Sequence, residues 1–205
     1  MSPRLPLRDL REARADPARY RNKLLNPPRG GGPNYFNALR DAIFNFHKAE
    51  WTAAEAEWYL EGRLNSLPDT VGRADVSDQF RWYVGEYEAR GWTTFHTRMN
   101  VSIPLPSWVS ANLSVSGEIA RIDLVPSGGY AGWVFLSGDA EGWRDDPRMP
   151  LIQEELTQKM NAADDEVSVG VYALRERSAE LTRYYATEIE KTRSSLEELL
   201  QQLRL

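Results

Sequence analysis

Two carboxylates and an arginine lie within one short segment, residues 116–124, whose sequence is Ser-Gly-Glu-Ile-Ala-Arg-Ile-Asp-Leu. Carboxylate oxygens are the ligands that Mg²⁺ and Mn²⁺ prefer, so Glu118 and Asp123 are candidate metal ligands. The segment is typical of a β-strand, along which side chains alternate between two faces. On a regular strand, Glu118 therefore shares a face with Ala120, and Asp123 points the opposite way.

Basic residues are concentrated near the N-terminus, although the formal net charge of the whole chain is −5. A basic arm on an acidic body could contact phosphate groups, while the alternative is a solvated, arginine-rich helix face. The candidate DNA-binding residues are Arg8, Arg11, Arg14, Arg19 and Arg21. A separate pair, His47 and Glu50, is three positions apart on a predicted helix and could share a metal or form a surface contact.

Strands and helices must position these residues. Alternating apolar residues predict strands over 95–105, 109–125, 130–136 and 167–173, the second with a phase shift near Gly117 that indicates a bulge or burial on both faces. Helical periodicity predicts helices over 6–25 with a break near Asp16, from the N-cap Asn34 through about Leu60, over 75–90 with Gly91 as the stop, over 149–160 and over 178–205.

This order predicts an α/β fold: a small mixed central sheet with a helix–strand–strand–strand–helix–strand core, flanked by helices. The Pro/Gly-rich stretch over 26–33 is typical of a connector. We therefore expect residues 1–33 to form a basic N-terminal arm and linker, and residues 34–205 a single domain that ends in the helix over 178–205.

Composition excludes several classes of chemistry. The chain of 205 residues is 41% hydrophobic, which is enough for a real core, and it has no cysteine, so disulfides, thiolate zinc sites and iron–sulfur clusters are excluded. With only two histidines and no Gly-x-Ser-x-Gly elbow, a serine triad is not expected. No apolar run approaches a signal peptide core or a membrane span, so we expect a soluble, cytoplasmic protein without membrane contact.

The element order, together with Gly117-Glu118-Ile119-Ala120-Arg121-Ile122-Asp123, resembles the PD-(D/E)XK nuclease superfamily. The most similar branch contains RecB-type nuclease domains and CRISPR spacer-acquisition nucleases, whose corresponding strand reads Gly-x-Ile-Asp-Arg-Ile-Asp. Four other segments are similar to family motifs: Asp16 to Tyr20, Phe36 to Ile43, Tyr130 to Gly138, and the helix that carries Gln153. The resemblance implies a restriction-endonuclease-like fold with two strand carboxylates that hold Mg²⁺ or Mn²⁺ and a lysine that activates water.

This chain departs from that pattern at each catalytic position. The resemblance places Ala120 and Val134 where the two carboxylates stand, Leu136 where the lysine stands, and Asp41 near a helix histidine. An apolar side chain cannot ligate a hard cation or position water. We therefore expect no catalytic residues, no metal and no cofactor.

Three hypotheses for function follow. The first is a catalytically inactive nuclease-fold protein that binds DNA or a protein partner in repair, recombination or defence. The second is an active Mg²⁺- or Mn²⁺-dependent deoxyribonuclease with relocated groups, for which the candidates are Glu118, Asp123, Asp41 and Gln153. The third is a structural protein that assembles through its C-terminal helix. For the DNA-binding hypothesis, the aromatic candidates for stacking on bases are Trp108, Trp133 and Trp143, with the alternative that they belong to the core.

Overall fold

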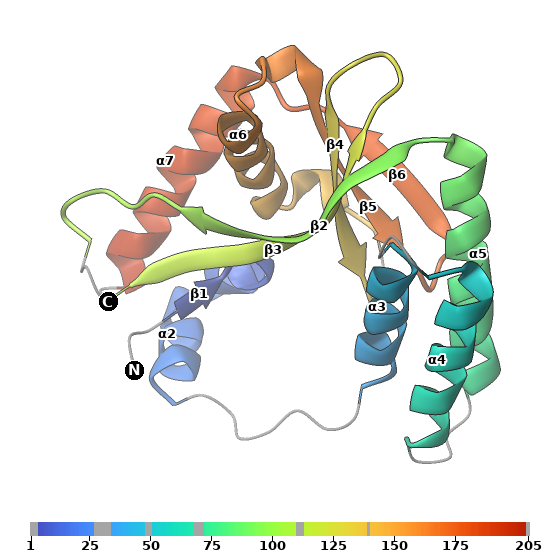
Figure 1. The fold of residues 1–205 in the computed structure, drawn as a ribbon. Helices are drawn as coiled ribbons and strands as arrows, with labels where there is room; N and C mark the ends of the chain where they lie inside the picture. Colours follow the sequence, from blue (N-terminus) through green and yellow to red (C-terminus); the bar gives the residue numbers. More distant parts are fainter. Residues whose placement is uncertain are drawn as a thin grey trace.

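The computed structural model of the chain describes residues 4–26, 34–47, 51–67, 72–109, 113–138 and 140–203. Within them, six strands form one mixed sheet flanked by helices, which confirms the predicted α/β class (Figure 1). The strands are β1 (Arg4–Pro6), β2 (Thr93–Ile103), β3 (Ser114–Leu124), β4 (Tyr130–Leu136), β5 (Val167–Ala173) and β6 (Ser178–Thr182). Their order is β1-β3-β4-β5-β6, and β2 pairs with β3.

Strand β3 connects two parts of the sheet. Strand β2 runs antiparallel along one of its edges, from Val115 to Leu124. The other edge is shared: β1 pairs in parallel with residues 114–116, and β4 pairs antiparallel with residues 121–124. Residues 117–120 therefore lie between the two ladders, where the β1 and β4 ends of the sheet separate.

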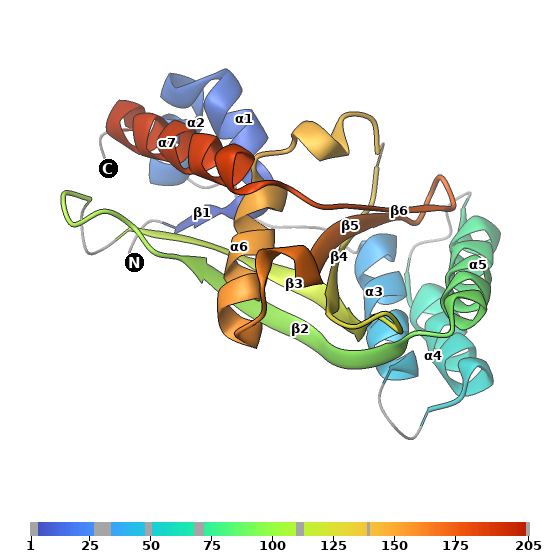
Figure 2. The ribbon, with the colours of Figure 1, turned by 90° about the horizontal axis from the view of Figure 1, so that it is seen from above.

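Two helix groups cover the sheet and form two hydrophobic cores. Helices α3 (Tyr35–Phe46), α4 (Ala53–Asn65) and α5 (Arg73–Arg90) share one core with Trp133 and Tyr172. Helices α1 (Leu10–Ala15), α2 (Pro17–Leu25), α6 (Arg148–Met160) and α7 (Ala186–Leu203) contribute to the other core, with Val134 and Val171. Figures 1 and 2 show α3–α5 grouped away from α6 and α7. Three short 3₁₀ turns are η1 (Leu7–Asp9), η2 (Trp143–Asp145) and η3 (Asp164–Glu166).

Several predicted elements are confirmed by their caps and bounds. The side chain of Asn34 accepts a hydrogen bond from the backbone N–H of Phe36 and begins α3. Gly91 ends α5 with a left-handed φ of 62°. Strands β4 and β5 have the bounds that their apolar runs predict, and β4 is central, between β3 and β5.

Two predicted helices are wrong in extent. The helix expected from Asn34 to Leu60 is two helices, because Thr52 and Glu55 form a capping box that begins α4. The helix expected over 178–205 begins only at Ala186, because Ser178–Thr182 pairs with β5 as strand β6. The apolar stripe of α7, which includes Leu196, Leu199 and Leu203, is buried in the core of this chain.

Residues 4–26, expected as part of a basic arm, are built into the sheet and its core. Strand β1 pairs with β3, and Leu5, Leu7 and Tyr20 are buried. An ideal Cβ at Gly117 would lie 2.9 Å from a methyl group of Leu7, so glycine at this position lets η1 cross closely over β3. Within the described part of the chain, no helix is long and apolar enough to cross a membrane.

Candidate functional site

A groove of about 690 Å³ lies over residues 117–120 of β3, which pair with β2 on one edge and have no strand partner on the other, between the β1–η1 segment and helix α3. Its lining also includes Asn100 of β2, the last residues of β4 and two residues of α6. The groove exists because the β3–β4 ladder ends at the Arg121–Trp133 pair, beyond which β1 takes over the same edge of β3. The sheet topology thus leaves an open depression that is lined by Gly117, Glu118 and Ala120 of β3.

The three apolar positions singled out in the sequence come together in this groove. Ala120 lies on β3 directly before the last paired residue, and Val134 and Leu136 lie on β4 beyond it. All three line the groove, together with Glu118. The methyl, isopropyl and isobutyl groups give this part of the lining an apolar surface that cannot coordinate a hard cation.

Arginines surround the groove from separate elements. Arg4 and Arg8 come from the β1–η1 segment, Arg40 from α3 and Arg148 from α6. Arg4 donates to the hydroxyl of Ser116 at 2.6 Å and makes no ion pair with any residue that the structure describes. The side chain of Arg8 is 76% exposed and lies 3.6 Å from the carboxylate of Asp9.

The two carboxylates that line the groove are both neutralised by neighbouring cations. Glu118 lies 2.6 Å from the guanidinium of Arg40 and 3.5 Å from that of Arg98. Asp9 accepts a hydrogen bond from the hydroxyl of Tyr20 at 2.7 Å and lies 3.5 Å from Lys23. The lining therefore holds four arginines and two carboxylates, and a third carboxylate, that of Asp146, lies 2.8 Å from Arg148. Positive charge remains in excess among the lining side chains.

Asp123, the second candidate carboxylate, is enclosed on the α3–α5 side of the sheet. Its Oδ2 accepts hydrogen bonds from Arg121 Nη2 at 2.7 Å and from Trp133 Nε1 at 2.8 Å, and neither Arg121 nor Asp123 is exposed. Burial raises the pKa of Asp123 above its ordinary value, against the opposing effect of Arg121. The carboxylate has no open coordination position towards the groove.

The position of Asp123 corrects the expectation that it points away from the face of Ala120. Trp133, which donates to Asp123, belongs to the same core as Ala120, whereas Ile119 and Ile122 both contribute to the other core. Residues 119–123 are all buried, so β3 is packed on both faces. Strict alternation is lost there, because Ile119 and Ile122 are three positions apart and still share one core. The register of its partner β2 also shifts, between Thr94 and His96.

Four further side chains enclose Arg121. The hydroxyl groups of Tyr83 and Tyr172 accept hydrogen bonds from its guanidinium, and the ring of Tyr87 lies 4.8 Å from it. His47 Nε2 lies 3.4 Å from Arg121 Nη1, and His47 Nδ1 lies 3.1 Å from the hydroxyl of Thr94. Burial and the positive charge of Arg121 lower the pKa of His47 to about 2, so this imidazole is neutral and accepts rather than donates towards Arg121.

The remaining candidate ligands are not brought to the groove. Asp41 lies 3.7 Å from Arg63 of α4, and the amide of Gln153 makes two 2.8 Å hydrogen bonds with the backbone of Tyr184. Glu50 lies outside the described residues. Across the described ranges, no three His, Cys, Asp or Glu side chains are grouped as a metal site would require.

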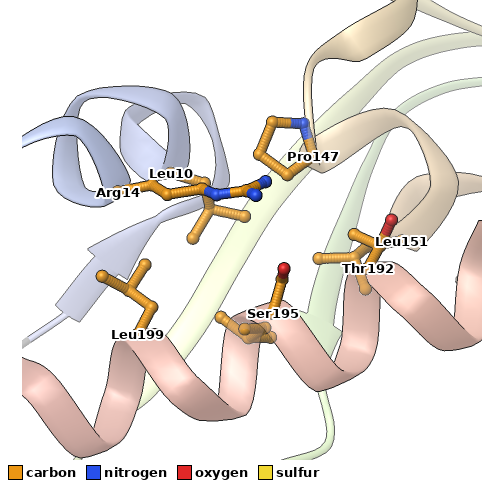
Figure 3. A pocket seen from close by; sticks show the side chains of 8 residues that line it. Leu10, Arg14, Pro147, Leu151, Thr192, Ser195 and Leu199 are labelled. Atoms are coloured by element: carbon orange, nitrogen blue, oxygen red, sulfur yellow. The ribbon is translucent and has the colours of Figure 1, made fainter.

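Of the five N-terminal arginines predicted to contact DNA, only Arg8 lines the groove. Arg11 and Arg14 lie on α1, and Arg19 and Arg21 on α2, all with exposed side chains. The side chain of Arg14 instead reaches over a small pocket between α1, α6 and α7 (Figure 3). Sequence reasoning counted Arg4 among the basic residues of the N-terminal segment but did not include it in the DNA-binding set. It missed Arg40, Arg98 and Arg148, because they are far apart in sequence and only the fold brings them together.

The three tryptophans considered for base stacking do not line the groove. Trp133 and Trp143 are buried, and their indole N–H groups donate to Asp123 and Glu180. Trp108 is 51% exposed at the loop between β2 and β3. The aromatic side chains that do line the groove are Phe36 and Phe135.

Comparison with protein-family models and with curated proteins finds no match to this chain.

Proposed function

We propose that this chain is a catalytically inactive protein of the nuclease type that binds a nucleic-acid strand in the groove over β3. The observation that carries this proposal is the convergence of Ala120, Val134 and Leu136 in an open, arginine-lined groove. The groove combines a surface that can accept a chain-like ligand with a centre that lacks the groups for metal-assisted hydrolysis.

The charges favour a phosphate-bearing ligand. Arg4 and Arg8, on one wall of the groove, can contact phosphates of a strand that crosses β3, and Arg40 adds a positive charge on the other wall. Asn37 and Asn100 supply amide groups for sugar or base edges, and Phe36 supplies an aromatic surface. The acidic net charge of the chain does not oppose this, because the lining of the groove itself holds four arginines and only two carboxylates.

Salt-dependent binding tests the proposal. We expect single- and double-stranded oligonucleotides, followed by fluorescence anisotropy, to lose affinity steeply as KCl rises, because bound phosphates release counterions. Arg8→Gln should reduce the slope of log affinity against log salt by about one. The matched control is Arg81→Gln, since Arg81 is an exposed, ion-paired arginine of α5 outside the groove lining. Affinity that ignores salt, or equal effects of the two substitutions, contradicts nucleic-acid binding in this groove.

One observation favours an active metal-dependent nuclease as the second candidate. Glu118 is a carboxylate inside the groove, beside Ala120. An active enzyme would cleave DNA with Mg²⁺ or Mn²⁺, stop with EDTA, and lose cleavage in Glu118→Ala. If DNA stays intact after prolonged incubation at high protein concentration, the nuclease is excluded and strand binding is the function that is left.

A further inference from the structure

Three charged side chains form a compact cluster at one side of the groove. Arg40 from α3 and Arg98 from β2 reach Glu118 of β3 from different elements, at 2.6 and 3.5 Å. The two guanidiniums also flank one aromatic ring, since they lie 5.5 and 4.7 Å from the centre of the Phe44 ring. Two cations are thus held near one carboxylate by packing on a common surface.

The backbone of Arg98 adopts an energetically unfavourable conformation. Its φ is 57°, in the left-handed region that residues other than glycine rarely adopt. The β2–β3 ladder pairs Thr97 with Arg121 and Met99 with Ile119 but does not pair Arg98. Strained backbone of this kind is concentrated at sites with a function, and here it places a long cation next to Glu118.

We infer that Arg40 and Arg98 form an anion subsite for a terminal phosphate group, and that Glu118 occupies this subsite until such a phosphate displaces it. The inference deepens the proposed function and rests on it, because a strand in the groove would present its end to the subsite. The cluster is accessible to a ligand: the side chains of Arg40, Glu118 and Arg98 are 25%, 26% and 54% exposed.

Charge explains why a terminal phosphate suits the subsite better than an internal one. An internal phosphodiester carries one negative charge, so its exchange with Glu118 replaces one monoanion by another and leaves the carboxylate without its partners. A terminal phosphomonoester approaches two negative charges at neutral pH and has three acceptor oxygens. It can therefore accept from both guanidinium groups and gain more from the two cations than Glu118 does.

The test compares internally labelled oligonucleotides of one sequence with a 5′-phosphate, a 3′-phosphate or hydroxyl ends. We expect wild-type protein to bind one of the phosphorylated forms about fivefold more tightly than the hydroxyl form. Arg98→Gly should bring the forms within about twofold of one another, because it removes one cation of the subsite. Glu118→Gln should tighten binding of the hydroxyl form, because no carboxylate then has to be displaced.

A preference for neither phosphorylated form, or weaker binding of every form by Glu118→Gln, overturns the subsite and leaves strand binding in the groove intact. A second readout keeps the two proposals separate: inorganic phosphate at constant ionic strength should raise the melting temperature of wild-type protein more than that of Arg98→Gly. If no oligonucleotide binds but this difference is present, the subsite serves a free phosphate compound and the strand proposal fails. If neither effect is seen, both proposals fail. Arg81→Gln is the control in each arm and should behave as wild type.

Discussion

Strand β3 carries two arginine–carboxylate groups a few residues apart, and burial gives them different roles. Arg121 and Asp123 are both 0% exposed and are enclosed by aromatic side chains. Glu118, three positions before Arg121, meets Arg40 and Arg98 at the accessible side of the groove. The same pairing chemistry therefore serves the fold where water is excluded and is available to a ligand where water enters.

The enclosed group has no spare capacity for a ligand. Asp123 accepts from Arg121, Trp133 and Thr94, so both of its oxygens already have donors. Arg121 in turn donates to Asp123, Tyr83 and Tyr172. A saturated buried network of this kind fixes neighbouring elements relative to one another, because any lost member leaves an unsatisfied polar group.

The largest expected effect is on this enclosed group. Arg121→Met should reduce the free energy of unfolding by about 3–5 kcal/mol, because it leaves the carboxylate of Asp123 buried without its cation. Urea denaturation followed by circular dichroism measures the change.

The matched variant on the open side is Arg40→Met, which removes an ion pair of similar length from a partly exposed site. It should cost about 1 kcal/mol or less, because water can solvate Glu118.

The double variant Arg121→Met/Asp123→Asn should recover part of the stability that Arg121→Met loses, since no buried charge remains. Equal losses in the two single variants would show that burial does not separate the two groups.

His47 adds a pH dependence to the enclosed group. Its pKa in the folded protein is lowered to about 2, while an unfolded histidine has a pKa of about 6.5. Below pH 6.5 the unfolded chain binds a proton that the folded chain does not, so stability present at pH 7 is lost as the pH falls. From this residue alone we expect a loss of about 2 kcal/mol between pH 7 and pH 5.

Denaturation curves at several pH values, for wild type and His47→Gln, isolate this contribution. The variant should be less stable at pH 7 but should lose less stability between pH 7 and pH 5. The control variant is His96→Gln, because the side chain of His96 is exposed on β2, outside the enclosed group. Parallel curves for wild type and His47→Gln contradict a buried neutral imidazole.

Local sequence signals were sufficient for most of the fold. The apolar run of β4 and the glycine stop of α5 are set by residues close in sequence, so they were predictable. Strands β1 and β6 were not, because three and five residues carry little periodicity and their pairing with β3 and β5 decides their conformation. The break before α4 had a readable signal, the Thr52–Glu55 capping box, that the longer helical periodicity obscured.

The candidate site, too, has features that could be predicted from the sequence and features that could not. The apolar residues Ala120, Val134 and Leu136 could be singled out from a resemblance in sequence, and the structure places them together in one groove. The arginines around them could not be predicted as a group, because they come from β1, η1, α3, β2 and α6. The role of Asp123 depends on β3 being packed on both faces, which strand alternation alone does not describe.

The smallest expected effect on stability separates function from fold most sharply. Arg98→Gly relieves a left-handed backbone, worth about 1 kcal/mol, and this gain offsets the entropy that glycine adds to the unfolded chain and the loss of an exposed ion pair. The free energy of unfolding should therefore change by less than about 1 kcal/mol in either direction.

Ser102→Gly is the control on the same strand. Ser102 is exposed and has an ordinary backbone conformation, so glycine there should destabilise the protein by about 0.5–1 kcal/mol without compensation. If Arg98→Gly destabilises more than Ser102→Gly, the contacts of Arg98 support the fold, and the open group on β3 would then resemble the enclosed one. If it destabilises less while the preference for a terminal phosphate disappears, the strained arginine serves a ligand and not the fold.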